Sequence, residues 1–273
     1  MALRSIGTVE LPPHRRAGGF DHASVHRTAD RLYVAHTANH SVEVIDLAGR
    51  RHEATLEGFP GVAGAAVHED RALLVATCRG EGTVGLAALS DPAAITRLTV
   101  GPRPNGLALA AGTDLALAAC IGDPTPPSFA IIDLGRSEVL AWASLPGRPR
   151  WTVHDERARC FYVNVAAPPQ IAVVSADPPF EILRSIPIPA AGPHGLELDA
   201  RRGVLHCACD AGSVVTVEAA SGQVVAQVPI AAARVVETLT TEEGAHTLGF
   251  DAEREHVYVF LPGAHTAAVF AES

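Results

Sequence analysis

Two histidines, an aspartate, an arginine and an asparagine stand at matching positions along this chain, and together they suit metal or acid–base chemistry. Imidazole and carboxylate groups are ligands that divalent metals accept in enzymes. An imidazole is also the commonest general base near neutral pH, and a guanidinium binds carboxylates through a two-bond fork. The matching positions, in chain order, hold Asp21, Ala63, Asn105, Arg150, His194 and His246.

His194 and His246 are the centre of the expected site. Together with Asp21, or with His22 if the alignment shifts by one residue, they would give three ligands to a divalent metal. Metal-bound water or one of the two imidazoles would then act as the catalytic base. Polar residues at solvated positions can also be idle, so a purely structural role stays open for each residue taken singly.

Substrate contacts and further catalytic groups are expected from four other residues. Arg150 would bind an anionic group of the substrate or stabilise developing negative charge. Asn105 would hold the substrate beside it, and His36 would add an outer contact. Glu237 lies in a long stretch, 231–245, that is typical of a lid and would supply an acid or a ligand. The same stretch could instead be a solvated acidic loop.

A pattern of four short strands repeats along the chain and must position these side chains. The successive matching positions are 42, 42, 45, 44 and 52 residues apart. Each position is followed by a β-rich segment, then by a second one and, in five of the six units, by a third. Four strands per unit at this period indicate a β-propeller. The clearest β-rich segments are 33–36, 74–77, 162–165 and 258–261.

The sixth unit is one strand short, and the other end of the chain offers the missing strand. Residues 3–12 read like the outer strands elsewhere, for example 182–188. We therefore expect one all-β domain, residues 1–273, that is a six-bladed propeller of four-stranded blades with residues 3–12 completing the last blade. In a propeller the first strand of each blade begins at one mouth of the central channel. This arrangement would bring the matching positions together around one axis.

The repeat resembles the YVTN-type propeller repeat. The resemblance rests on residues 193–199 (Pro-His-Gly-Leu-Glu-Leu-Asp) and on 33–36 (Tyr-Val-Ala-His) with 42–46 (Val-Glu-Val-Ile-Asp). It covers essentially the whole chain and implies a propeller fold. This wide group includes non-catalytic binding proteins and the related, metal-dependent streptogramin B lyases. Its members are often exported, whereas this chain carries no export signal.

A second, shorter resemblance concerns residues 103–108 (Arg-Pro-Asn-Gly-Leu-Ala). They are similar to a segment of gluconolactonase-type six-bladed propellers, in which the asparagine helps to bind a divalent metal. The resemblance gives that role to Asn105 alone. The leading glutamate of that family has no counterpart here, and Asp21 would be its substitute.

Composition argues against several classes of partner and compartment. The formal net charge is −9, and no dense Lys/Arg cluster offsets it, so nucleic acid is not an expected partner. No apolar run approaches the roughly 18 residues of a membrane span. Five cysteines without a Cys-x-x-Cys pattern, and no signal-peptide pattern, favour the cytoplasm. Cys207 and Cys209 would face the same side of a strand, as half of a metal site or as small core residues.

The sequence therefore predicts an enzyme that acts on a small anionic molecule at the channel mouth. A metal-assisted hydrolase of the lactonase kind, or a lyase, fits the residue types best, with a divalent metal whose identity the residues do not define. The alternative is a non-catalytic propeller that binds a small ligand or a protein partner on its upper face. The residues alone leave the choice between these two classes open.

Overall fold

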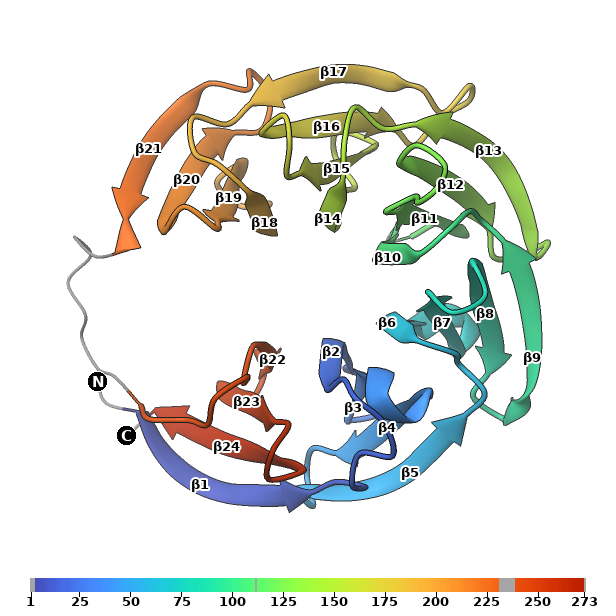
Figure 1. Ribbon diagram of the computed structural model, residues 1–273, viewed down its shortest axis with the longest axis vertical. Coiled ribbons are helices and arrows are strands. Elements are labelled where there is room, and N and C mark those ends of the chain that lie inside the picture. The colour runs from blue at the N-terminus through green and yellow to red at the C-terminus, as the bar shows by residue number, and fades with distance from the viewer. Residues whose placement is uncertain (1–2, 111, 231–238, 273) are drawn as a thin grey trace. The chain divides into compact units, whose positions relative to one another are not determined.

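The computed structural model describes residues 3–110, 112–230 and 239–272. Its strands form six four-stranded antiparallel sheets, which are the blades of an all-β propeller (Figure 1). This confirms the predicted fold class and the number of blades. None of the helical segments among these residues is long and apolar enough to cross a membrane.

The chain divides into two compact units, and each is described by itself. The first unit combines the described parts of 1–81, 85–97 and 235–273. It holds the blade β2–β5, most of the blade β6–β9, and the blade of β22–β24 with β1. Its elements are β1 (Leu3–Glu10), β2 (Phe20–His26), β3 (Arg31–His36), η1 (Thr37–Asn39), β4 (Ser41–Asp46), β5 (Arg51–Glu57), β6 (Val62–His68), η2 (Glu69–Arg71), β7 (Leu73–Cys78), β8 (Thr83–Ala88), β9 (Asp91–Thr99), β22 (Thr247–Asp251), β23 (His256–Leu261) and β24 (Thr266–Glu272).

The second unit combines the described parts of 82–84 and 98–234 and holds three complete blades. In each of them four consecutive strands pair in chain order. The strands are β10 (Pro104–Leu109), β11 (Leu115–Cys120), β12 (Ser128–Asp133), β13 (Glu138–Ser144), β14 (Pro149–Asp155), β15 (Cys160–Val165), β16 (Gln170–Ser175), β17 (Ile182–Pro187), β18 (Pro193–Asp199), β19 (Val204–Cys209), β20 (Ser213–Glu218) and β21 (Val224–Pro229).

Burial along the strands explains why they form where the sequence is rich in Val, Ile and Leu. Most second and third strands of a blade, such as β7 and β15, are buried on both faces, so apolar residues dominate them. The fourth strands face water on one side. In β13, for example, exposed and partly buried residues alternate along the strand, as the period of two requires.

The hydrophobic core lies between neighbouring blades of a unit. In the second unit, Phe129 and Leu117 of one blade pack in a single cluster with Phe161 and Val163 of the next. The opposite face of the blade β14–β17 packs, through Tyr162, against the blade that begins with β18. A blade therefore buries both faces only when it has a neighbour on each side, which is why the repeat is stable as an array.

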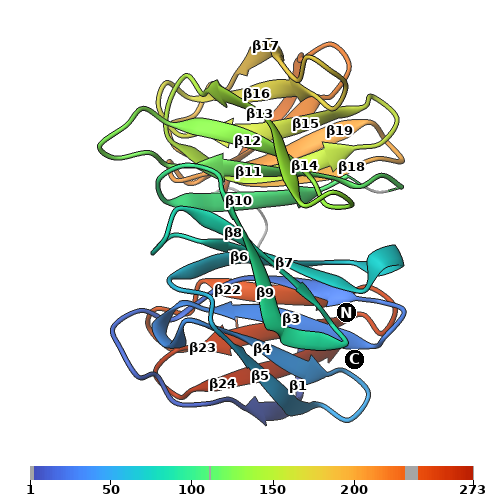
Figure 2. The ribbon, with the colours of Figure 1, turned by 90° about the vertical axis from the view of Figure 1, so that its right-hand side faces the viewer.

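The last blade combines strands from the two ends of the chain. β1 pairs antiparallel with β24, from Leu3 opposite Glu272 to Glu10 opposite Thr266. The strands β1, β24 and β23 lie side by side in Figure 2. This confirms the predicted completion of the last blade by the N-terminal strand.

Candidate functional site

Five of the six matching positions lie in β-bulges at the start of a first strand. Pairing between the first and second strands is interrupted between Phe20 and Ala23, Val62 and Ala65, Pro104 and Gly106, Pro149 and Thr152, and Pro193 and Gly195. A bulge releases a residue from the alternation of the strand and turns its side chain in a new direction. The bulged residues include Asp21, Ala63, Asn105, Arg150 and His194.

In the second unit two of these residues meet on one carboxylate. His194 Nδ1 lies 2.8 Å from Asp210 Oδ1, and Arg150 Nη2 lies 3.7 Å from Asp210 Oδ2. Asp210 directly follows β19, in the same blade as His194. The side chains of His194 and Asp210 are each 53% exposed, whereas that of Arg150 is 23% exposed. We call these three residues the Arg–Asp–His cluster.

Two buried asparagines hold the bulges that carry the cluster. Asn105 donates from Nδ2 to the carbonyl of Arg150 at 3.1 Å. Asn164 donates from Nδ2 to the carbonyls of His194 at 3.2 Å and Gly195 at 2.9 Å. These carbonyls lie where the strand pairing is interrupted, so the amides supply donors for groups that would be costly to bury unpaired. Asn105 thus supports the backbone of Arg150, and its predicted contact with substrate stays a prediction.

The arrangement suits anion binding and proton transfer. Because Nδ1 of His194 donates to Asp210, Nε2 of the neutral ring is left as a proton acceptor. Arg150 has a buried Nε without a hydrogen-bond partner among the described residues. Its contact with Asp210 is longer than a hydrogen bond. A partly buried guanidinium in this condition has donors left for a carboxylate or phosphate.

The first unit brings Asp21 and His22 together with an arginine. Arg79 Nη2 lies 2.8 Å from Asp21 Oδ2, and His22 Nε2 lies 3.4 Å from Asp21 Oδ1. All three side chains are less than one third exposed. A metal on Asp21 would have to compete with this ion pair.

His36 lies in a buried polar network in the first unit. Its Nδ1 donates to Glu43 Oε1 at 2.8 Å, and both side chains have no exposed surface. Ser41 donates to the same oxygen at 2.8 Å, and Glu43 Oε2 accepts from Thr55 at 2.6 Å and His52 at 2.9 Å. Burial alone raises the pKa of Glu43, but the hydrogen bonds from His36, Thr55 and Ser41 outweigh it and hold that pKa below its usual value. The predicted role of His36 as an outer substrate contact is not tested by these contacts and stays a prediction.

The other two predicted catalytic residues stay predictions. His246 immediately precedes β22 in the first unit and is exposed, with its Nδ1 2.6 Å from the carbonyl oxygen of Gly244. Glu237 lies outside the described residues.

The described residues contain no group of three or more His, Cys, Asp or Glu side chains that could hold a metal ion. His194 lies in the second unit, and Asp21, His22 and His246 lie in the first. Cys207 and Cys209 do face one side of β19, with their sulfur atoms 3.8 Å apart, but both are buried. The expected divalent metal and its ligands His194, His246, Asp21 and His22 stay a prediction.

Three residues that organise these clusters were missed from the sequence. Asp210 and Arg79 occupy the same place in their repeats, directly after the second strand of a blade. Asp21, the partner of Arg79, and Arg150, one of the two partners of Asp210, lie in the bulge of the preceding blade, so only an alignment of the blades in space would pair them. Glu43 could have been suspected, because a charge inside the apolar run 41–46 must find buried partners.

No protein-family model matches this chain, and no curated protein sequence matches it either. Among solved structures, hydrazine synthase of Kuenenia stuttgartiensis is similar in fold, with a TM-score of 0.71 and 15% sequence identity. The alignment covers 94% of this chain and 78% of the hydrazine synthase chain. At this identity the likeness supports the propeller fold alone, and membership of the YVTN-type or gluconolactonase-type families stays a prediction.

Proposed function

We propose that this chain is an enzyme that acts on a small anionic molecule, as a hydrolase of the lactonase or esterase kind or as a lyase. In this proposal His194 is the general base and Arg150 binds the anionic group of the substrate. The observation that carries it is the position of Asp210, whose two oxygens face His194 Nδ1 and the Arg150 guanidinium. One carboxylate thus orients both groups next to each other.

The imidazole would move one proton. With Nδ1 committed to Asp210, Nε2 of His194 would accept a proton from water that attacks an ester or lactone carbonyl. For a lyase, it would take the proton on the carbon next to a carboxylate, and the electron pair would form the double bond as the leaving group departs. Asp210 would stabilise the imidazolium that forms in either case. A general base of this kind contributes about 10²–10⁴-fold to the rate.

Arg150 would set the preference for anions. Its side chain is mostly buried and its Nε has no hydrogen-bond partner among the described residues. A carboxylate on the substrate would meet the exposed part of the guanidinium in a charge-assisted pair. In the same position the guanidinium could stabilise an oxyanion, which would lower the barrier to the chemical step as well as bind the substrate.

A non-catalytic binding protein is the rival. Arg150 and His194 would then hold an anion without turnover. Turnover and binding must therefore be measured separately, and a metal-assisted reaction needs its own readout because metal ligands were also expected at His194.

The proposal is tested by measuring turnover of a panel of lactones, carboxylate-bearing esters and β-hydroxy acids. The proteins compared are wild type, His194→Gln and His206→Gln. His206 is the matched control, because it lies on β19 of the same blade and contacts Thr216 at 3.1 Å instead of Asp210. We expect His194→Gln to lower kcat about 10²–10⁴-fold and His206→Gln to leave it unchanged. Equal activity of the three proteins would refute the role of His194.

Two further measurements separate the alternatives. Arg150→Lys should raise KM for anionic substrates while uncharged esters are affected little, because lysine cannot reproduce the two-bond fork.

Elemental analysis of protein purified without a metal-affinity tag should give the same metal content for wild type and His194→Gln. Stoichiometric metal that is lost in His194→Gln would replace the imidazole base by a metal-assisted reaction. Anion binding without turnover of any substrate would favour the binding protein.

A further inference from the structure

A histidine cluster holds the segment that connects the last blade to the first. Residues 11–19, which we call the strap, run from the end of β1 to the start of β2, both in the first unit. β1 belongs to the blade of β22–β24, and β2 opens the next blade. The strap therefore joins the strand that completes the last blade to the first blade.

The strap is fixed by hydrogen bonds at both of its sides. Leu11 N donates to the carbonyl of His265 at 2.9 Å, in the turn between β23 and β24. On the other side, Asn39 of η1 accepts from Arg15 N at 2.8 Å and donates to the carbonyl of Pro13 at 3.0 Å. The amides of Leu11 and Arg15 are thus protected from solvent exchange only while the strap is in place.

His14 lies between these anchors and touches three other rings. Its ring centroid is 4.5 Å from that of His265, 4.9 Å from that of His36 and 5.2 Å from that of Phe20. Its backbone nitrogen also donates to His265 Nδ1 at 3.4 Å. Three imidazoles from the strap, from β3 and from the β23–β24 turn thus meet at one place.

The surroundings of His14 favour a neutral ring. Nε2 of His14 and Nε2 of the fully buried His36 have no hydrogen-bond partner among the described residues. A proton added to Nε2 of His14 would therefore be buried without an acceptor beside it. It would also place positive charge against the neighbouring imidazoles, which can themselves accept a proton.

The charged groups around His14 do not cancel this effect. Arg15 and Arg16 follow it on the strap, and Arg15 is paired with Glu57 of β5 at 3.0 Å. Glu43 faces His36 from β4 and already accepts four hydrogen bonds. Glu242, before β22, accepts hydrogen bonds from the backbone nitrogens of Gly263 and Ala264. Burial, and then the charges of His36 and His265, lower the pKa of His14, against a weaker rise from Glu242.

We propose that the His14–His36–His265 cluster is a pH-sensitive latch that holds the strap above about pH 6.5, the ordinary pKa of histidine, and releases it in mildly acidic solution. A base whose pKa is lowered in the folded state stabilises that state when neutral. The stabilisation is complete above the ordinary histidine pKa and is lost as pH falls through the lowered value. Release would free the link between β1 and β2 while the blades of the second unit stay folded.

The latch is tested by amide hydrogen exchange of the full chain at pH 7.5 and pH 5.5. The exchange rates at each pH are normalised to the intrinsic exchange rate at that pH. We expect the peptide that covers the strap to lose at least tenfold in protection at the lower pH. The hairpin of β11 and β12 in the second unit, whose strands contain no histidine, should keep its protection. Strap protection that is the same at both pH values would overturn the proposal, and so would a loss shared by all peptides, because that is global unfolding.

Two variants make the test specific to the cluster. His14→Phe keeps a ring against Phe20 and His265 but cannot be protonated, so its strap should stay protected at pH 5.5. His154→Phe is the matched control. His154 lies against Phe161 at 4.9 Å in the second unit, and burial lowers its pKa too. His154→Phe should leave the pH response of the strap as in wild type. A strap that opens equally in wild type and His14→Phe would show that His14 is not the switch.

Discussion

The buried carboxylate of Glu43 should be one of the strongest single contributors to stability in the first unit. It has no exposed surface and accepts four hydrogen bonds, two at each oxygen. Glu43→Gln keeps the size of the side chain and one acceptor oxygen, but turns the other oxygen into a donor. Two of the four donors then lose their acceptor and face an NH₂ group.

The magnitude follows from those two bonds. A hydrogen bond to a charged group contributes roughly 1.5–3 kcal/mol, so the loss of two costs about 3–6 kcal/mol. Glu43→Gln also removes the cost of burying a charge, which offsets part of the loss of the two hydrogen bonds. The net loss in the free energy of unfolding is then roughly 2–4 kcal/mol. At about 2–4 °C per kcal/mol for a chain of this size, Tm should fall by roughly 4–16 °C.

Urea unfolding of wild type, Glu43→Gln and Glu57→Gln provides the assay. Glu57 lies on β5 of the same blade and pairs with Arg15, but both side chains are more than half exposed. Its substitution should therefore change the free energy of unfolding by less than about 1 kcal/mol. A Glu43→Gln effect as small as that of Glu57→Gln would refute the argument that the four contacts act on a buried charge.

The pH dependence gives a second check on Glu43. Because its pKa is lowered in the folded state, the ionised carboxylate stabilises the fold at all pH values above the usual glutamate pKa. That contribution is lost only as pH falls through the lowered value. The difference between wild type and Glu43→Gln should therefore be constant from pH 8 to pH 5 and shrink below about pH 4.5. A difference that disappears already at pH 6 would point to the histidines as its source.

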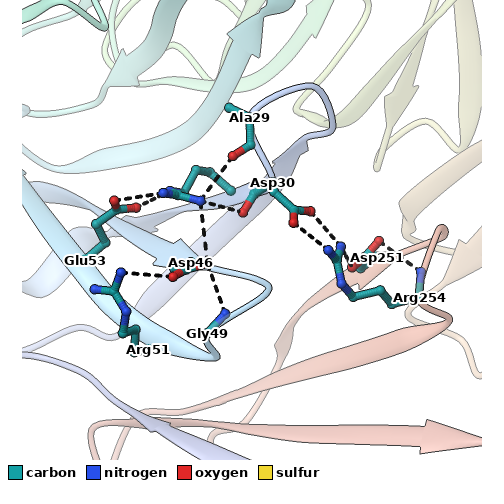
Figure 3. A network of polar contacts seen from close by, with 9 residues as sticks. Ala29, Asp30, Asp46, Gly49, Arg51, Glu53, Asp251 and Arg254 are labelled. Atoms are coloured by element: carbon teal, nitrogen blue, oxygen red, sulfur yellow. Dashed lines mark hydrogen bonds and ion pairs between the residues drawn. The ribbon is translucent and has the colours of Figure 1, made fainter.

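Two other predictions concern the ion pair between the last and the first blade and the reactivity of the buried thiols. Arg254 of the last blade forms a two-bond pair with Asp30 of the first blade and also contacts the buried Asp251 (Figure 3). Urea unfolding of Arg254→Ala should therefore show a free energy of unfolding that is lower by about 1–3 kcal/mol. A loss below about 0.3 kcal/mol would show that solvent screens the pair. Burial raises the pKa of Cys120 and of Cys207 to about 12. The native protein should therefore react with a thiol reagent such as DTNB at pH 8 only as fast as it unfolds. Rapid labelling of either thiol without denaturant would contradict this prediction.

The strands were predictable because burial on both faces leaves a direct trace in the residues. The Tyr-Val segments that mark β3 and β15 are continuous apolar runs, and their spacing indicates the blades. The matching positions were predictable for the same reason, since they precede these runs at a constant distance. Five of them lie in bulges, which is a local feature of the strand start.

The contacts of the candidate site were not predictable to the same degree. Asp210 pairs with Arg150 across two blades, 60 positions apart in the numbering, and no periodicity within one blade indicates such a pair. The buried state of His36 also escaped the sequence, because its partner Glu43 comes from the next strand of the same blade. Alternation gives the face of a strand on which a residue lies, but not which polar groups meet there.

The pairing of β1 with β24 has a consequence for synthesis of the chain. β1 is made before every other strand of its sheet, and β24 is made after all of them. During elongation β1 must therefore wait with both edges unpaired, the condition in which strands aggregate. Its sequence suits that delay, because Arg4, Thr8 and Glu10 keep it polar and an irregularity between Ser5 and Gly7 shifts its pairing register. The strand that completes the last blade is thus polar enough to stay solvated until β24 is made.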